Sequence, residues 1–141
     1  MVTHTPQNHF DITISVKESD IDFLNHVNNT VYLRWAQDVA VAHWKAVATD
    51  EQQEKMIWVV TRHEIDYKNP AKLGDEIIAR TWVGKATEVI FERFTEITRA
   101  SDKKVLAKAK TLWCPISTKT GRIVRVDEDV RNRFSVPEEQ D

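Results

Sequence analysis

Apolar and polar positions repeat with two different periods along this chain, and the change of period separates one helix from several strands. Residues 10–16 (FDITISV) alternate between apolar and polar, which indicates a half-buried strand. From Asn28 or Asn29 to about residues 48–50, apolar residues recur every three or four positions, as they do along an amphipathic helix. The predicted apolar face of this helix consists of Val31, Tyr32, Trp35, Ala36, Val39, Ala40, Ala42 and Val47.

Beyond the helix, the period of two returns four times. Turn-forming residues separate these segments, and the predicted strands are residues 56–67, 76–83, 89–98 and 105–114. We expect Asn69-Pro70, Gly84-Lys85 and Pro115 to mark strand ends. Because the connections are short, the four strands are predicted to form an antiparallel meander.

Together these segments predict an α+β domain, in which one long helix is wrapped by an antiparallel sheet of about five strands. Residues 50–55 predict a loop or a further short turn, and residues 127–134 predict a short helix. The domain is expected to span residues 10–134, with flexible tails at 1–9 and 135–141. A monomer of this kind leaves a strand edge open. We therefore expect a homodimer that pairs strand edges across a two-fold axis, with a tetramer left open.

The composition narrows the class of protein without naming a function. The chain has 141 residues, which is typical of one domain, and its formal net charge of −2 provides no general attraction for nucleic acid. No apolar run approaches the roughly 20 residues of a membrane span, and residues 1–10 lack the pattern of a secretory signal. The single cysteine, Cys114, excludes an intrachain disulfide and a multi-cysteine metal site. We expect a cytoplasmic protein with no nucleic-acid partner and no membrane span.

The most informative stretch lies directly before and into the helix, at residues 19–32 (SDIDFLNHVNNTVY). Two acids, one histidine and three asparagines fall between positions 20 and 29. A buried polar group without a partner costs roughly 1–3 kcal/mol, so such a cluster beside a buried helix indicates a functional site. The asparagines also favour a helix start, because the Asn side chain accepts hydrogen bonds from the first free backbone N–H groups.

The spacing D-x-D-x-x-x-H-V-N-N-x-x-Y, from Asp20 to Tyr32, resembles the signature of the 4-hydroxybenzoyl-CoA thioesterase-like acyl thioesterases. Plant acyl-ACP thioesterases carry a similar version. Residues 67–76 (YKNPAKLGDE) resemble a second landmark of this family, and the likeness covers nearly the whole chain. This chain has Asn25 where many members have glycine, and Leu24 where the plant enzymes have an asparagine thought to be functional.

The resemblance implies a hotdog fold and hydrolysis of an acyl-CoA thioester to a free acid and CoA. It implies no metal and no cofactor other than the CoA of the substrate. By this resemblance Asp22 is the general base or the nucleophile, and His26 orients water or hydrogen-bonds the thioester. The backbone N–H of Asn29, at the positive end of the helix dipole, would polarise the carbonyl. Asn28 and Tyr32 are candidate substrate-binding residues.

Other interpretations remain open at this point. Asp20 is expected to cap the loop, and helix capping or core packing also accounts for Asn28 and Tyr32. The substrate carrier could be an acyl-carrier protein instead of CoA, and a non-catalytic hotdog protein that binds an acyl ligand is a further alternative. Basic residues beyond the helix either bind the phosphates of CoA or are simply solvated; they are Arg80, Arg93, Arg99, Lys103, Lys104 and Lys108.

Overall fold

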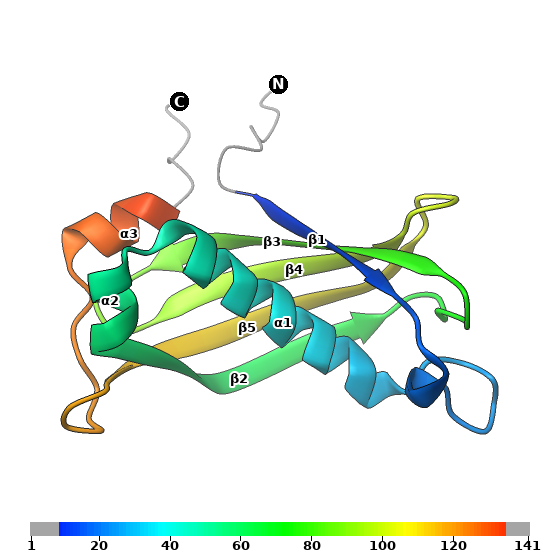
Figure 1. Ribbon diagram of the computed structural model, residues 1–141, viewed down its shortest axis with the longest axis horizontal. Coiled ribbons are helices and arrows are strands. Elements are labelled where there is room, and N and C mark those ends of the chain that lie inside the picture. The colour runs from blue at the N-terminus through cyan, green and yellow to red at the C-terminus, as the bar shows by residue number, and fades with distance from the viewer. Residues whose placement is uncertain (1–8, 135–141) are drawn as a thin grey trace.

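The computed structural model describes residues 9–134, so the tails predicted at 1–9 and 135–141 lie outside the described residues, except for His9. One antiparallel sheet of five strands carries a long helix, α1, across one of its faces (Figure 1). This arrangement confirms the predicted α+β architecture. In chain order the elements are β1 (Phe10–Ser15), the 3₁₀ turn η2 (Glu18–Asp20), α1 (Asn29–Val47), α2 (Asp50–Lys55), β2 (Met56–Tyr67), β3 (Glu76–Ala86), β4 (Phe91–Arg99), β5 (Val105–Ser117) and α3 (Glu128–Phe134).

Helix α1 forms where the apolar period predicted it. Its start is capped by Asn28, whose side chain accepts a hydrogen bond from the Thr30 N–H. The buried face matches the prediction, except that His43 is buried while Ala42 and Val47 are only half-buried. None of the helices within residues 9–134 is long and apolar enough to cross a bilayer.

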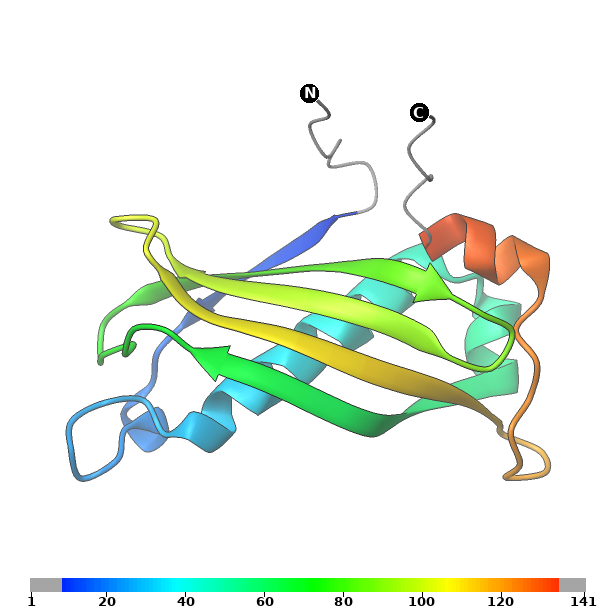
Figure 2. The same cartoon turned by 180° about the vertical axis from the view of Figure 1, so that it is seen from behind.

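The two faces of the sheet have different surroundings. Helix α1 covers one face, and the view from behind shows no helix of residues 9–134 across the other (Figure 2). Strand β4 accordingly alternates between buried and half-buried residues along most of its length. The core between sheet and helix has two parts, one around Trp35 and Val39, the other around Ala40 and Phe134 of α3.

The strand order β1-β3-β4-β5-β2 corrects the predicted meander. Strands β3, β4 and β5 follow one another as predicted, but β2 lies at the far edge and pairs antiparallel with β5. The connection of residues 68–75 therefore crosses the end of the sheet. There the N–H groups of Lys68 and Asn69 donate to the carbonyl of Leu106. Sequence spacing could not exclude a hairpin here, because antiparallel neighbours in sequence often pair directly.

Two predicted strand ends are wrong. Strand β3 continues through Gly84 to Ala86, and its register against β4 shifts between Val83 and Ala86. A Cβ added to Gly84 would lie 2.6 Å from the ring of Phe94, so glycine allows this close approach. Strand β5 continues through Pro115, whose carbonyl accepts a hydrogen bond from the Val124 N–H. The carbonyl of Pro115 thus points away from β2, and in a strand the N–H of the same residue would point to that side too. The missing N–H of the proline therefore costs no hydrogen bond to β2.

The loop before α1 closes on itself. Ile21 and Val27 form an isolated antiparallel bridge, and the N–H of Asp22 donates to the carbonyl of His26 at 2.8 Å. Between them Asn25 has a φ of 65°, in the left-handed region. Glycine adopts this region freely, and asparagine tolerates it better than most other residues. Asn25 therefore adopts a backbone conformation that glycine would also adopt without strain.

Asp20 ties this loop to α1. Its side chain is 2 % exposed and accepts hydrogen bonds from the Lys17 N–H at 2.9 Å and from Nη2 of Arg34 at 2.8 Å. Its carbonyl accepts a third bond, from the Asn28 N–H. Burial alone would raise the pKa of Asp20, but the bonds from Arg34 and Lys17 outweigh it and hold the pKa below its ordinary value. These contacts agree with the expected capping role of Asp20.

Substituting Asn25 should separate backbone shape from side-chain chemistry. We expect Asn25→Gly to unfold at about the same urea concentration as the wild type. We expect Asn25→Val to lose about 1–2 kcal/mol of unfolding free energy, because a β-branched residue is strained at positive φ. Equal stability of the valine and glycine variants would contradict the left-handed conformation.

Substituting Asp20 should reveal the anchor of the loop. At neutral pH, Asp20→Ala is expected to lose about 1–3 kcal/mol in urea unfolding, because the Lys17 N–H and the Arg34 guanidinium lose the buried carboxylate that accepts their hydrogen bonds. Because the folded-state pKa is lowered, this stabilisation is present at neutral pH. It disappears as the pH falls below the ordinary pKa of 3.8.

The matched control for this experiment is Asp38→Ala, at an exposed position of the same helix. It should change the free energy of unfolding by no more than about 0.5 kcal/mol. If the two alanine variants were equally stable at neutral pH, Asp20 would not anchor the loop.

Candidate active site

A pocket of about 400 Å³ lies at the N-terminal end of α1. The loop before the helix, the first turn of α1, the end of β2 and the start of the 68–75 connection form its walls. All the residues that the sequence predicted for catalysis or substrate binding line it, namely Asp22, His26, Asn28, Asn29 and Tyr32. The structure adds residues that the sequence did not single out for the site, namely Leu24, Val27, Tyr67, Lys68, Asn69 and Pro70. The individual chemical roles stay predictions.

The carboxylate of Asp22 has one oxygen engaged and one oxygen available. Its Oδ1 accepts hydrogen bonds from the backbone N–H of Leu24 at 2.9 Å and of His26 at 3.3 Å. Its Oδ2 has no hydrogen-bond partner within residues 9–134, and the residue is half-buried. The two backbone bonds hold the carboxylate in one orientation, so the second oxygen can face a water molecule or a substrate from a fixed position.

The start of α1 contributes free donors to the same pocket. The Oδ1 atom of Asn28 accepts from the N–H of Thr30 at 3.0 Å and from its hydroxyl at 2.9 Å. The N–H of Asn29 donates to no group within the described residues, and it lies at the positive end of the helix dipole. The imidazole of His26, which is half-buried, also has no hydrogen-bond partner there.

Tyr32 joins the helix to the opposite wall of the pocket. Its side chain is almost completely buried, and its hydroxyl oxygen accepts a hydrogen bond from the Ala71 N–H at 2.9 Å. Its ring lies edge-on to the ring of Tyr67, whose own hydroxyl donates to the carbonyl of Asn29 at 3.1 Å. Burial raises the pKa of Tyr32, so its hydroxyl remains protonated at neutral pH. Tyr32 thus packs in the core and at the same time forms part of the pocket wall.

Arg99 holds the 68–75 connection in place. Its guanidinium donates to Oδ2 of Asp75 at 3.0 Å, to Oδ2 of Asp102 at 2.8 Å and to the carbonyl of Pro70 at 2.8 Å. The sequence of residues 67–76 drew attention by its resemblance to a family landmark, but the place of these residues beside the start of α1 could not be predicted. That place depends on the crossing of the connection over the end of the sheet.

Three of the predicted phosphate-binding candidates are buried or already paired with other groups. Arg93 is only 5 % exposed, Arg80 pairs with Asp11 at 2.8 Å, and Arg99 is engaged by the contacts above. Lys68 is the basic residue in the lining of the pocket. Within residues 9–134, no three His, Cys, Asp or Glu side chains are grouped closely enough to hold a metal ion.

Two plant proteins are related to this chain in sequence. A chloroplastic palmitoyl-acyl carrier protein thioesterase of Cuphea hookeriana is 27 % identical over 79 residues, which are 56 % of this chain and 19 % of that protein. A protein of the same description from Gossypium hirsutum is 23 % identical over 134 residues, which are 89 % of this chain and 32 % of that protein. The chain thus spans only about a fifth to a third of the length of these relatives.

Solved structures share the fold, and a family model shows the family. A Thermus thermophilus thioesterase complexed with coenzyme A and Zn has a TM-score of 0.76 and 25 % identity, covering 88 % of this chain and 95 % of that one. A 1,4-dihydroxy-2-naphthoyl-CoA thioesterase from Synechocystis has a TM-score of 0.77 and 18 % identity, covering 89 % and 94 %. These structures confirm the predicted hotdog fold. The model of the thioesterase-like superfamily matches residues 16–134, and the chain therefore belongs to this superfamily.

Proposed function

We propose that this chain hydrolyses an acyl-CoA thioester to a free acid and coenzyme A. The observation that carries the proposal is a pair of groups in one pocket, the Oδ2 atom of Asp22 and the backbone N–H of Asn29. Both groups are without a partner within residues 9–134. Thioester hydrolysis needs such a pair, a base or nucleophile together with a donor for the developing oxyanion. Membership of the superfamily and the coenzyme A in the Thermus thermophilus structure support the same chemistry.

In the proposed reaction, the Asn29 N–H donates a hydrogen bond to the carbonyl oxygen of the thioester, and the helix dipole strengthens this bond. Asp22 either takes a proton from the water that attacks the carbonyl carbon, or attacks that carbon itself and forms an acyl anhydride that water then hydrolyses. In both routes the C–S bond breaks, the sulfur leaves as the thiol of CoA, and water supplies the second oxygen of the acid. His26 orients the water or the thioester, while Asn28 and Tyr32 contact the substrate.

Two other functions compete with this one. The names of the plant relatives support hydrolysis of an acyl group from acyl-carrier protein, with the same residues acting on the same thioester bond. A non-catalytic protein that binds an acyl ligand is the third candidate. The available Oδ2 atom of Asp22 favours an enzyme over this third candidate. A carboxylate in the pocket disfavours binding of an apolar ligand, so a protein that only binds such a ligand gains nothing from it.

We further propose that the protein works as a homodimer. Strand β2 lies at the edge of the sheet and has 12 residues, whereas the strand at the other edge, β1, has six. Among the β2 residues, Ile57 is 52 % exposed and Val59 is 41 % exposed. A long edge with exposed apolar residues is normally covered, and a second copy of the same strand is a natural cover across a two-fold axis.

Release of free thiol from a panel of acyl-CoA and acyl-ACP substrates tests the proposed function. The panel should include several chain lengths and aromatic acyl groups. We expect at least one acyl-CoA to be cleaved, and Asp22→Asn to lower kcat for that substrate by about 100-fold or more. The amide should preserve the fold, because its oxygen can still accept hydrogen bonds from the N–H groups of Leu24 and His26.

Asp38→Asn, at an exposed helix position, is the matched control and should keep full activity. Cleavage of acyl-ACP alone would select the second candidate function. Absence of thiol release from every substrate would reject the enzyme, and full activity of Asp22→Asn would reject the role of this carboxylate.

Sedimentation velocity tests the proposed dimer. We expect the wild-type protein to sediment as a dimer, and Val59→Lys to shift the population toward monomer because a charged side chain disfavours edge pairing. The control is Val89→Lys, at an exposed apolar residue outside the strands, which should leave the dimer intact. A monomeric wild-type protein would contradict the proposal.

A further inference from the structure

A second pocket, of about 300 Å³, lies near the other end of α1. Residues of α1, α2, β2, β4, β5 and α3 line it, and none of them lines the candidate active site. Asn29, in the candidate active site, and Trp44, in the second pocket, are 15 positions apart on the helix. At 1.5 Å per residue this places them about 22 Å apart. The second pocket is therefore a separate structural feature that the proposed hydrolysis does not use.

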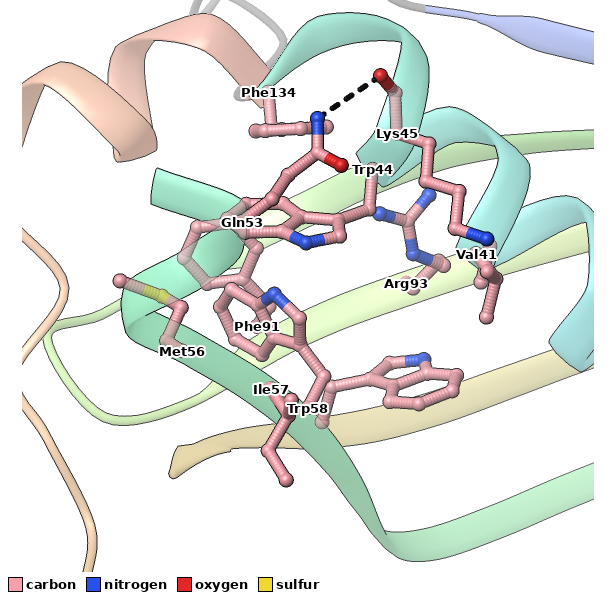
Figure 3. A pocket seen from close by; sticks show the side chains of 12 residues that line it. Val41, Trp44, Lys45, Gln53, Met56, Ile57, Trp58, Phe91, Arg93 and Phe134 are labelled. Carbon is pink, nitrogen blue, oxygen red and sulfur yellow. Dashed lines mark hydrogen bonds between the residues drawn. The ribbon is translucent and has the colours of Figure 1, made fainter. Parts of the chain in front are cut away.

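Aromatic side chains form much of the wall of this pocket (Figure 3). The ring centroids of Trp58 and Phe91 lie 4.7 Å apart, and those of Trp44 and Phe134 lie 5.5 Å apart. Trp113 of β5 completes the aromatic part of the lining. Such walls suit an alkyl chain or an aromatic ring, and the volume lies at the lower end of the range of about 300–1,000 Å³ for ligand pockets.

A buried cation lines the same pocket. In β4 the residues that face the helix alternate with residues that face away, and Arg93 occupies a buried register position between Phe91 and Thr95. Its side chain is 5 % exposed, and Figure 3 shows its guanidinium among the side chains of the pocket. Burial lowers the pKa of Arg93 to about 9, so the group is still charged at neutral pH. A charge in such a position is costly unless an opposite charge accompanies it.

No carboxylate of residues 9–134 accompanies this charge. Both hydrogen bonds of the Arg93 guanidinium use Nη1, which donates to Nδ1 of His43 at 2.8 Å and to Oγ1 of Thr81 at 3.2 Å. Burial and the charge of Arg93 lower the pKa of His43 to about 3, so His43 is neutral and only accepts the bond. The remaining charged residue in the lining, Lys45, is also basic.

Two further donors in the lining lack partners. The indole N–H groups of Trp58 and Trp113 are buried without a hydrogen-bond acceptor among the described residues. Buried donors of this kind are normally satisfied by protein, water or ligand. The pocket thus combines apolar walls with several donors and positive charge, and no carboxylate stands among its lining residues to balance that charge.

We propose that this pocket binds the carboxylate of an organic acid that has an alkyl or aromatic body. The carboxylate accepts hydrogen bonds from the Arg93 guanidinium and neutralises its charge, while the apolar body lies against the aromatic walls. A small inorganic anion would leave the apolar walls exposed to water, and an uncharged apolar molecule would leave the cation unpaired. This inference concerns binding alone, so it holds or fails independently of the proposed hydrolysis.

Calorimetric titration of the wild-type protein with sodium octanoate and with octan-1-ol tests the proposal. The two probes have the same alkyl chain length and differ in charge. We expect octanoate to bind at least about tenfold more tightly, which is the effect of one hydrogen bond to a charged group. Similar affinities for the acid and the alcohol, or the absence of saturable octanoate binding, would overturn the proposal.

Variants locate the bound acid. Arg93→Met replaces the cation by an apolar side chain, and we expect it to weaken octanoate binding at least about tenfold while octanol binding changes little. Arg62→Met, at an exposed residue of β2, is the matched control and should leave both affinities unchanged. Unchanged octanoate binding by Arg93→Met would overturn the proposal. If that variant does not fold, the wild-type comparison between acid and alcohol decides.

Asp22→Asn separates the two pockets. It alters the candidate active site, so we expect its octanoate affinity to equal that of the wild type. A large change in this affinity would place the acid in the candidate active site and overturn the proposal. Inactivity of the wild-type protein toward every thioester would reject the proposed hydrolysis without affecting this result.

Discussion

The burial of one face of α1 against the sheet is the constraint on which the rest of the structure depends. Trp35 and Val39 of this face are almost completely shielded from water, and each such side chain contributes about 1.5–3 kcal/mol. The strands alternate because one of their faces must pack against the helix while the other does not. With the helix held in this way, its two ends take fixed positions at opposite ends of the sheet, and a pocket lies near each of them.

At the N-terminal end of α1, some residues both stabilise the fold and position the groups of the candidate active site. Tyr32 belongs to the buried face, yet its hydroxyl also fixes the 68–75 connection through the Ala71 N–H. Asp20 pairs with Arg34 and so fixes the loop that carries Asp22. The first N–H of the helix cannot be satisfied within the helix, and it remains open to the pocket. A rigid helix start beside a carboxylate of fixed orientation is a suitable arrangement for polarising and attacking a carbonyl group.

Near the C-terminal end of α1, the alternation of buried and half-buried positions in β4 places a charged side chain in the interior. The register of β4 turns Arg93 toward the helix, where an apolar residue would be expected, and His43 and Thr81 provide only neutral partners for it. A buried charge that neutral groups alone accompany is unfavourable for folding. An arginine in this position is therefore better explained by a ligand than by packing, and that reasoning underlies the proposed acid-binding pocket.

The sequence by itself determined the long helix, its start at Asn28–Asn29, the number of strands and the residues grouped before the helix. These features depend on local periodicity and capping, which neighbouring residues decide. It could not determine that β2 pairs with β5, that β5 continues through Pro115, or that Arg93 faces inward. Each of these depends on which segments distant in sequence lie side by side. Only the tertiary structure brings Tyr67 and Lys68 beside Asp22, because the end of β2 and the connection that follows it lie next to the start of α1.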